Sequence, residues 1–320
     1  MSESLVIGAD VGGTAVKYVV TDASYTPRVE GEIFCDPTDP GHTLDDLAGT
    51  IRSRLGAAWG DVETVGFACA GIVDPVAGRL GRAPNLPGWE GTDLAALAGA
   101  AFAGLPAVLA NDVNAALMGE WRLGAGRGCR DLLMLALGTG VGGGIVVHGS
   151  LLVGGRCGAA ELGHMILDRE GPACGCGNRG CLEAYASASG LMAEARRRAA
   201  VPGADLDLVA FCSRTDADPR GLAALAVAGN AEAVDIYARA GTMLGLAVGN
   251  LVNALDPDRV IIGGGVAQAG DLLLATCRAE VPRVVLGERS KSVPIVLADL
   301  GPRAAALGAA VMALDEVAGG

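Results

Sequence analysis

The sequence predicts an α/β protein made of two related halves with a cleft between them. Its 320 residues correspond to about two domains of typical size. A short apolar strand at residues 5–7 runs into a glycine turn, and a second strand follows at residues 17–22. The same order of strand, glycine turn and strand recurs over residues 132–148. This internal repeat indicates that both halves are built on one plan.

Hydrophobic periodicity and segment length assign the remaining elements. The predicted helices cover residues 43–55, 93–102, 188–200, 231 through the 240s, and 304–317. The predicted buried strands cover residues 64–70, 107–110 and 259–263. We expect a small N-terminal domain over residues 1–115, completed by a C-terminal helix at 302–320. A large domain over residues 116–301 carries a cysteine-rich loop.

Composition and charge exclude several classes of protein. The formal net charge of −12 argues against general nucleic-acid binding, which needs a basic surface. No apolar run is long enough to span a bilayer, and the N-terminus lacks the basic segment of a signal peptide. The nine cysteines are odd in number and mostly scattered, which is typical of buried thiols in a reducing compartment. We therefore expect a cytoplasmic protein that binds small molecules.

Three cysteines within eight residues form the most specific motif of the chain. Cys174, Cys176 and Cys181 are interleaved with glycines, and His164 lies ten residues before the first of them. Glycine allows a backbone tight enough for neighbouring thiolates to face one ion. A closed shell of three thiolates and one imidazole suits tetrahedral Zn²⁺ in a structural site. The alternative interpretation is three ordinary buried or paired cysteines.

The glycine turns are candidate phosphate-binding sites. The first, at residues 10–14, lies in a hairpin, so it is neither a Walker loop nor a Rossmann turn. A glycine hairpin presents backbone amides and a threonine hydroxyl to phosphate oxygens, and Asp10 is placed to hold Mg²⁺ through water. The alternative is a plain turn that needs positive φ. The candidate nucleotide-binding residues are Asp10, Gly12, Gly13, Thr14, Gly138, Thr139, Gly140, Gly264 and Gly265.

A candidate base and an acidic pocket follow from polar residues at the ends of strands. Asn111 and Asp112 follow the predicted strand at 107–110 and open a helix. Asp112 can be the general base that accepts the proton of an attacking hydroxyl, or it can simply cap the helix. Glu161 and Glu183 flank the cysteine motif. Together with Asp112 they would form a pocket that accepts hydrogen bonds from sugar hydroxyls.

Two further residues are candidates for sugar contacts. Asn85 lies in a turn-rich segment before Trp89 and can both donate to and accept from neighbouring hydroxyls. The alternative for this segment is a surface turn on which the tryptophan packs. His164 can bind zinc through one ring nitrogen and offer the other N–H to the sugar.

These motifs, in this order and over nearly the whole chain, resemble the ROK family of repressors, open-reading-frame proteins and sugar kinases, and within it the glucokinases. The resemblance implies a two-domain actin-like ATPase (ribonuclease H-like) fold that closes on the sugar. It implies ATP, Mg²⁺, a structural zinc, and phosphorylation of a hexose at the 6-hydroxyl with Asp112 as base. The sugar-binding residues carried over are Gly71, Asn85, Asn111, Asp112, Glu161, His164 and Glu183. The glycine turns would hold ATP, and a homodimer or homotetramer is expected.

Two features of the chain differ from parts of the family pattern. The first turn of the family usually ends in lysine, whereas Ala15 follows Thr14 here and Lys17 comes two residues later. Because strand side chains alternate, Lys17 is expected on the same side as position 15. The predicted first strand begins by residue 5, which leaves no room for the helix-turn-helix of the ROK repressors and favours a kinase. Alternatives to glucose are kanosamine and N-acetylmannosamine, and a non-catalytic sugar sensor is the alternative to an enzyme.

Overall fold

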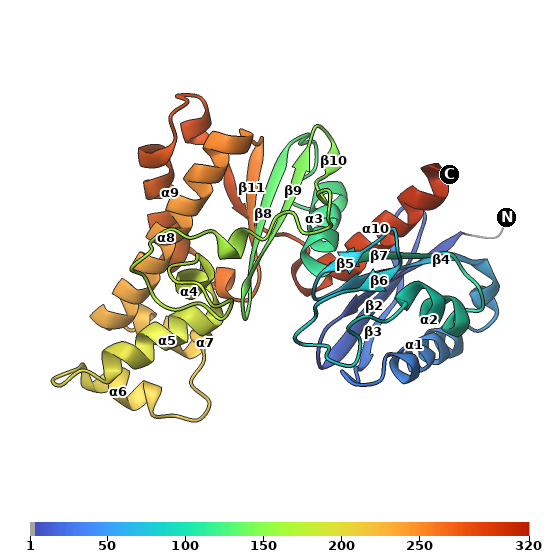
Figure 1. The fold of residues 1–320 in the computed structure, drawn as a ribbon, viewed down its shortest axis with the longest axis horizontal. Helices are drawn as coiled ribbons and strands as arrows, with labels where there is room; N and C mark the ends of the chain where they lie inside the picture. Colours follow the sequence, from blue (N-terminus) through green and yellow to red (C-terminus); the bar gives the residue numbers. More distant parts are fainter. Residues whose placement is uncertain (1–3, 320) are drawn as a thin grey trace. The chain divides into compact units, whose positions relative to one another are not determined.

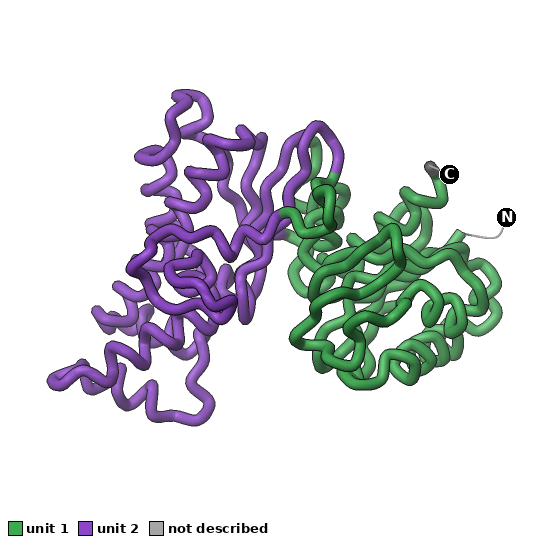
Figure 2. The backbone as a smooth tube through the Cα atoms, in the orientation of Figure 1, with its two compact units in different colours: residues 1–128, 151–159, 299–320 green, residues 129–150, 160–298 purple. Residues whose placement is uncertain are grey.

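The computed structural model describes residues 4–319, which form two compact units (Figures 1 and 2). Unit 1 comprises the chain up to residue 128, residues 151–159, and the chain from residue 299 onward. Unit 2 comprises residues 129–150 and 160–298. Each unit contains a five-stranded sheet, in line with the internal repeat. The compact units divide at residue 128, whereas the boundary expected from the sequence lay at 115, and residues 151–159 also belong to unit 1.

The sheet of unit 1 has the strand order β3-β2-β1-β4-β7. The predicted hairpin is formed by β1 (Leu5–Val11) and β2 (Ala15–Asp22), and β3 (Pro27–Phe34) pairs with β2. β4 (Val62–Cys69) is parallel to β1, and β7 (Ala107–Asn111) is parallel to β4. The short strands β5 (Val73–Asp74) and β6 (Arg79–Leu80) pair with each other. Because β1, β4 and β7 are parallel, their last residues lie at one edge of the sheet.

Helices pack on both faces of this sheet. α1 (Pro40–Leu55) and α2 (Leu94–Ala101) share a core with Leu5, Ile7, Ala9 and Val11 of β1. On the other face, Val6 of β1 packs against α10 (Ala304–Gly319), which lies beside α3 (Asp112–Leu123). Alternate residues of β1 therefore face two different cores, as the period of a strand requires.

α10 lies directly on the backbone of the sheet. A Cβ added to Gly8 of β1 would overlap the carbonyl oxygen of Ala306, and one on Gly66 of β4 would overlap that of Ala309. Any larger residue at either position would push the helix away from the sheet. The last helix thus covers one face of the sheet of unit 1.

A buried carboxylate fixes the end of α3. Glu120 is fully buried, and its side chain accepts hydrogen bonds from the backbone N–H groups of Ala125 (2.9 Å), Asp299 (3.1 Å) and Leu300 (2.8 Å). Three donors offset the cost of removing this carboxyl group from water. Glu120 thereby holds the segment that leaves α3 and the segment that leads into α10 at one point of unit 1.

The sheet of unit 2 has the order β10-β9-β8-β11-β12. The second predicted hairpin is formed by β8 (Leu132–Leu137) and β9 (Val141–Val147), with β10 (Ser150–Leu151) at its edge. β11 (Arg259–Gly263) lies parallel to β8, and β12 (Ile295–Leu297) lies parallel to β11. The turn after β8 and the glycines after β11 consequently lie at the same edge of this sheet.

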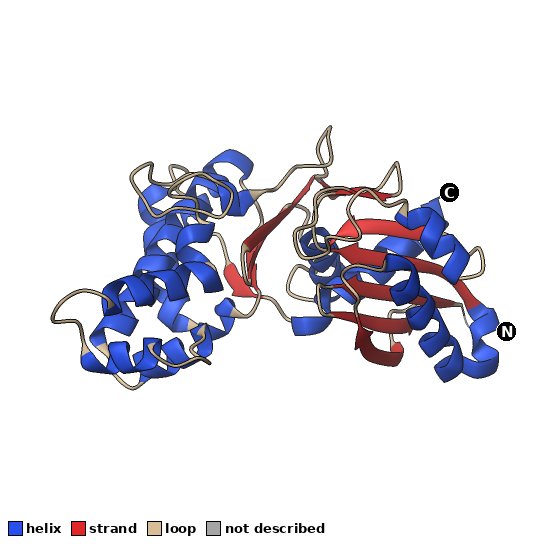
Figure 3. Ribbon diagram, turned by 60° about the horizontal axis from the view of Figure 1, so that its bottom comes forward, coloured by secondary structure: helices blue, strands red, loops and turns tan. Residues whose placement is uncertain are grey.

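The helices of unit 2 gather on one side of its strands (Figure 3). They are α4 (Glu183–Ala186), α5 (Ala188–Ala199), α6 (Leu206–Cys212), α7 (Pro219–Val227), α8 (Ala231–Leu255) and α9 (Asp271–Val284). One continuous core joins β8 and β11 to these helices. None of the helices formed by the described residues is long and apolar enough to cross a membrane.

Candidate active site

The carboxylates of unit 1 gather at the edge where β1, β4 and β7 end. Asp10 lies beside Ala68 of β4, and Cys69 lies beside Asn111 of β7, so the paired strands bring Asp10 and the start of α3 to the same edge. Burial and the nearby negative charge of Asp112 raise the pKa of Asp10 from 3.8 to about 6, while the charge of Lys17 lowers it. Two carboxylates near one another therefore share this site.

Asn111, and not Asp112, caps α3. The Asn111 side-chain oxygen accepts hydrogen bonds from the N–H groups of Val113 (2.9 Å) and Asn114 (3.1 Å). Its amide donates to the carbonyl of Gly71 (3.0 Å) and to the Asp112 carboxylate (2.9 Å). Asp112 lies in the first turn and also accepts from the Val113 N–H (3.0 Å). Two donors therefore hold the Asp112 carboxylate at the positive end of the helix.

Gly71 is required by the backbone at this point. Its φ is 123°, and an added Cβ would lie 2.6 Å from the carbonyl oxygen of Arg82. Glycine alone adopts this conformation readily, and the Gly71 carbonyl is thereby held where Asn111 donates to it. This contact links the loop after β4 to the start of α3.

The first glycine turn lies against the Asn85 segment. The N–H of Gly12 donates to the carbonyl of Ala15 (3.0 Å) and closes the hairpin. A Cβ on Gly13 would lie 2.8 Å from the carbonyl oxygen of Asn85, so the turn and this segment are in contact. Thr14 is exposed. The structure thus brings Asp10, Gly13 and Asn85 to one region of unit 1, while the Gly12 amide is already used within the turn.

Lys17 points to the side of the sheet on which Asp10 lies. It is directly opposite Asp10 in the β1–β2 register, and it is exposed between the buried residues Val16 and Tyr18. Side chains opposite each other in a strand pair are on one face of the sheet. The expected orientation of Lys17 is confirmed, and its charge acts on Asp10.

Replacing Asp10 by asparagine is expected to make the protein more stable at neutral pH. The folded state holds the Asp10 proton up to about pH 6, whereas the unfolded chain releases it near 3.8. Ionisation of Asp10 in the folded state therefore lowers the free energy of unfolding increasingly as pH rises from about 4 to about 6. Above about pH 6 the full loss is present. We expect Asp10→Asn to raise the free energy of unfolding by about 1–3 kcal/mol at about pH 8 and to have little effect below about pH 4. Urea denaturation across this range checks it, and a gain independent of pH would contradict the assigned cause.

The second glycine turn is held by Glu183. The N–H of Gly138 donates to the carbonyl of Gly140 (2.9 Å), and the N–H of Val141 donates to the Glu183 carboxylate (3.0 Å). A Cβ on Gly140 would overlap that carboxylate. The carbonyl of Gly138 accepts from Ala188, the first residue of α5 (2.9 Å). The turn is therefore fixed between Glu183, which follows the cysteine motif, and the N-terminus of α5.

The glycines after β11 reach the same edge of the sheet. Gly264 has a φ of 87°, and an added Cβ would overlap the backbone of Leu137 at the end of β8. Around Gly265 there is open space, and both glycines are exposed. The two turns predicted to hold a nucleotide, at 138–140 and 263–265, are thus neighbours in unit 2.

The turn that carries His164 packs on the glycine-rich strand β9. Residues Leu162–His164 form a short 3₁₀ helix. A Cβ on Gly163 would overlap the carbonyl of Val141, and one on Gly143 would overlap that of Ala160. The glycines of β9 therefore allow close approach of the segment with Glu161, which is exposed, and His164, which is half-buried. From the sequence, the glycines of β9 were expected only as part of a hairpin.

Substitution of Gly163 by alanine tests this packing. The added methyl group must displace the His164 turn from β9, so we expect a loss of about 1–3 kcal/mol in stability and weaker sugar binding. Thermal unfolding and a binding titration measure the two effects. The matched control is Gly155→Ala, where the added Cβ meets open space. If the two variants had the same melting temperature and the same affinity for sugar, the close contact between Gly163 and β9 would be unimportant.

His164, Cys174, Cys176 and Cys181 come together in unit 2. Their ligand atoms all lie within 4.8 Å of one another. The Sγ atoms of Cys176 and Cys181 are 3.7 Å apart, and Cys174 Sγ is 3.8 Å from Nδ1 of His164. Thiolates about 2.3 Å from a tetrahedral zinc are about 3.8 Å from each other, so the four residues fit the ion. None of the nine cysteines is in a disulfide.

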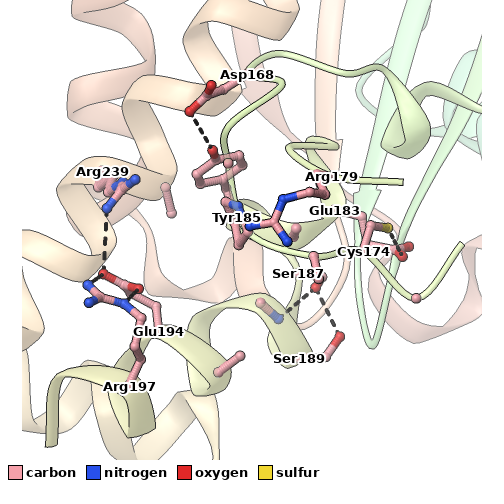
Figure 4. Close-up of a pocket in the computed structure, with 18 of the residues that line it drawn as sticks. Asp168, Cys174, Arg179, Glu183, Tyr185, Ser187, Ser189, Glu194, Arg197 and Arg239 are labelled. Carbon is pink, nitrogen blue, oxygen red and sulfur yellow. Dashed lines mark hydrogen bonds and ion pairs between the residues drawn. The ribbon is translucent and has the colours of Figure 1, made fainter. Parts of the chain in front are cut away.

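Glu183 joins this cluster to the glycine turn. Its second carboxylate oxygen lies 3.4 Å from Cys174 Sγ (Figure 4). Burial raises the pKa of the Cys174 thiol, whereas the backbone N–H of Asn178 lowers that of Cys176. Nδ1 of His164 faces the sulfur atoms, which leaves Nε2 as the ring nitrogen for another partner. Glu183 thus contacts both the second glycine turn and a candidate metal ligand.

The two units define an α/β protein with two sheets, a glycine turn in each, and a cluster of three cysteines and one histidine. The ROK family model matches residues 6–316. The chain is 35% identical over 321 residues to a glucokinase of Streptomyces coelicolor, covering 97% of this chain and 98% of the relative. It is 33% identical over 264 residues to a kanosamine kinase of Amycolatopsis mediterranei, covering 82% and 80%.

A solved structure agrees with these relatives. The ROK family glucokinase of Streptomyces griseus, determined in complex with glucose and AMPPNP, superposes with a TM-score of 0.79 at 33% identity and covers 98% of this chain and 100% of its own. The chain belongs to the ROK family. Its predicted fold class, the two-domain actin-like (ribonuclease H-like) α/β fold, is confirmed.

Proposed function

We propose that this protein is an ATP-dependent kinase that phosphorylates the 6-hydroxyl of glucose. The observation that carries the proposal is the position of the Asp112 carboxylate in the first turn of α3, beside the Asn111 amide, with Asp10 at the same sheet edge. Phosphoryl transfer to an alcohol needs a carboxylate that accepts the hydroxyl proton. The glucokinase relatives and the glucose and AMPPNP complex support the assignment of sugar and donor.

Each group of residues has a proposed role. Asp112 accepts the proton of the attacking hydroxyl, and Asn111 positions the carboxylate through its amide. The other proposed sugar-binding residues are Gly71, Asn85, Glu161, His164 and Glu183. The turns at 12–14, 138–140 and 264–265 bind the phosphates of ATP with backbone amides, and Lys17 adds a positive charge. Asp10 would hold Mg²⁺, which neutralises phosphate charge when bound.

The metal proposed for the cysteine cluster is a structural zinc held by His164, Cys174, Cys176 and Cys181. The set of donors and their spacing support this choice. Zinc would keep the loop in the conformation in which Glu183 reaches the glycine turn. A cytoplasmic location and a homodimer or homotetramer are also proposed, and sedimentation analysis would determine the assembly.

The sugar and donor are tested by ADP release with ATP and Mg²⁺ over a panel of sugars. The panel contains glucose, mannose, N-acetylglucosamine, N-acetylmannosamine and 3-amino-3-deoxyglucose (kanosamine). We expect the highest kcat/KM for glucose. Turnover of ATP with none of these sugars, combined with measurable sugar binding, would contradict the kinase and favour a sensor. The same panel is measured with polyphosphate in place of ATP as the phosphate donor.

A kanosamine kinase is the second candidate. The specific observation in its favour is the identity of 33% to such an enzyme. Three of the proposed sugar-binding residues, Glu161, Glu183 and Asp112, are acidic and would also attract the ammonium group of that sugar. A preference for kanosamine over glucose in the panel would decide for it.

A further inference from the structure

Two backbone N–H groups of the second glycine turn have no partner among the described residues. They belong to Thr139, which is exposed, and to Gly140, which is half-buried. The N–H groups on either side are used within the protein, since that of Gly138 donates to the carbonyl of Gly140 (2.9 Å) and that of Val141 donates to Glu183 (3.0 Å). The N–H groups of Thr139 and Gly140 are therefore the donors that the turn can offer to a ligand.

The start of α5 holds the carbonyl groups of the same two peptide units. The N–H of Ala188 donates to the carbonyl of Gly138 (2.9 Å), and the hydroxyl of Ser189 donates to the carbonyl of Thr139. In a trans peptide the C=O and N–H bonds point in opposite directions, and the described residues contain no cis peptide bond. The N–H groups of Thr139 and Gly140 therefore both point away from α5. Successive N–H groups with a common direction form a site for an anion.

The Ser189 hydroxyl is itself oriented by the cap of α5. A carbonyl oxygen can only accept, so the hydrogen of the Ser189 hydroxyl lies toward Thr139, and the Ser189 oxygen accepts from the Ser187 hydroxyl (3.0 Å; Figure 4). The Ser187 oxygen in turn accepts from the N–H of Gly190 (2.9 Å). A chain of hydrogen bonds thus runs from the first turn of α5 to the glycine turn, and its members polarise one another.

We propose that Ser189 is a positioning residue for the phosphate groups of ATP. Its hydroxyl holds the Thr139 carbonyl on the side of α5, so that the N–H of Gly140 faces the phosphate oxygens. Without this hydrogen bond the peptide between Thr139 and Gly140 can rotate and present its carbonyl oxygen, which repels a phosphate. The role rests on the proposed function, because it requires ATP to bind at this turn. Ser189 itself needs no contact with the nucleotide.

The test is calorimetric titration of the full-length protein with AMPPNP and Mg²⁺ at saturating glucose. We expect Ser189→Ala to raise the Kd of AMPPNP about threefold to tenfold, because the hydrogen bond that orients one donor is lost. Ser189→Thr keeps the hydroxyl and should bind AMPPNP as the wild type does. The Kd of glucose and the melting temperature should not change in Ser189→Ala, since Ser189 is exposed and alanine is a good helix former.

The control is Ser213→Ala, which removes another exposed hydroxyl that donates to a backbone carbonyl, that of Val209 in α6. We expect this variant to bind AMPPNP and glucose as the wild type does. A wild-type Kd for AMPPNP in Ser189→Ala, or a loss that Ser189→Thr does not restore, would overturn the positioning role alone. A wild-type protein that neither binds AMPPNP nor releases ADP with any sugar would instead overturn the proposed kinase, and the role of Ser189 with it.

Discussion

Asp112→Asn is expected to lower kcat by about 10²–10⁴-fold, because the variant cannot accept the proton of the sugar hydroxyl. Asparagine has the same shape as aspartate, and its oxygen still accepts a hydrogen bond, so the start of α3 should remain folded. The cap itself is made by Asn111 and is not altered. Coupled ADP release measures kcat, and a glucose titration shows whether sugar binding survives.

The result separates catalysis from structure. A matched control is Asp45→Asn, which changes an exposed aspartate of α1. We expect the control to keep wild-type kcat and thermal stability. If Asp112→Asn kept near wild-type turnover, Asp112 would not be the base. If Asp112→Asn lost both its activity and its fold, kcat would be measured in Asp112→Glu, which keeps a carboxylate but displaces it.

The second large effect is expected from Cys176→Ser, which removes one ligand of the proposed zinc. Cys176 is exposed, so exchanging sulfur for oxygen costs little packing and mainly affects metal binding. We expect zinc content to fall from about one ion per chain to near zero after dialysis against a chelator, because three donors hold zinc far less tightly than four. The melting temperature should fall, and the KM for sugar should rise.

Hydrogen exchange would locate the damage. We expect faster exchange in residues 162–183 and unchanged protection in α8 and α9, since these helices belong to the main core of unit 2. Cys212→Ser is the control, because Cys212 lies outside the cluster. Full zinc content in Cys176→Ser would contradict the four-ligand site, and an unchanged melting temperature would contradict its structural role.

Much of the fold could be predicted from short-range patterns. The two glycine hairpins, the buried strands and the helix at Ala304–Gly319 follow from alternation and from runs of apolar residues. The three-residue strand β12 and the pairing of β3 at the sheet edge were not predicted, because each depends on a neighbour distant in the chain. The return of residues 151–159 to unit 1 is likewise a tertiary feature.

The candidate site, like the fold, could be predicted only in part from the sequence. The cysteine cluster was visible because its ligands are close in sequence, and only His164 had to be added across a short distance. By contrast, the division of labour between Asn111 and Asp112 needs side-chain geometry, since either residue is a good helix cap. The positions of Gly143 and Gly163 matter because of a contact between two segments that no local pattern reveals.

The packing of α10 has a consequence for how the chain is made. Unit 1 begins with the first strand, yet its sheet lacks the cover of one face until the last helix has been synthesised. All strands and helices of the core of unit 2 precede residue 299. Domains usually fold in the order of translation. Here the unit encoded in the middle of the gene can finish folding first, while the face of the N-terminal strands that carries Val6 and Val19 stays uncovered until α10 has been synthesised.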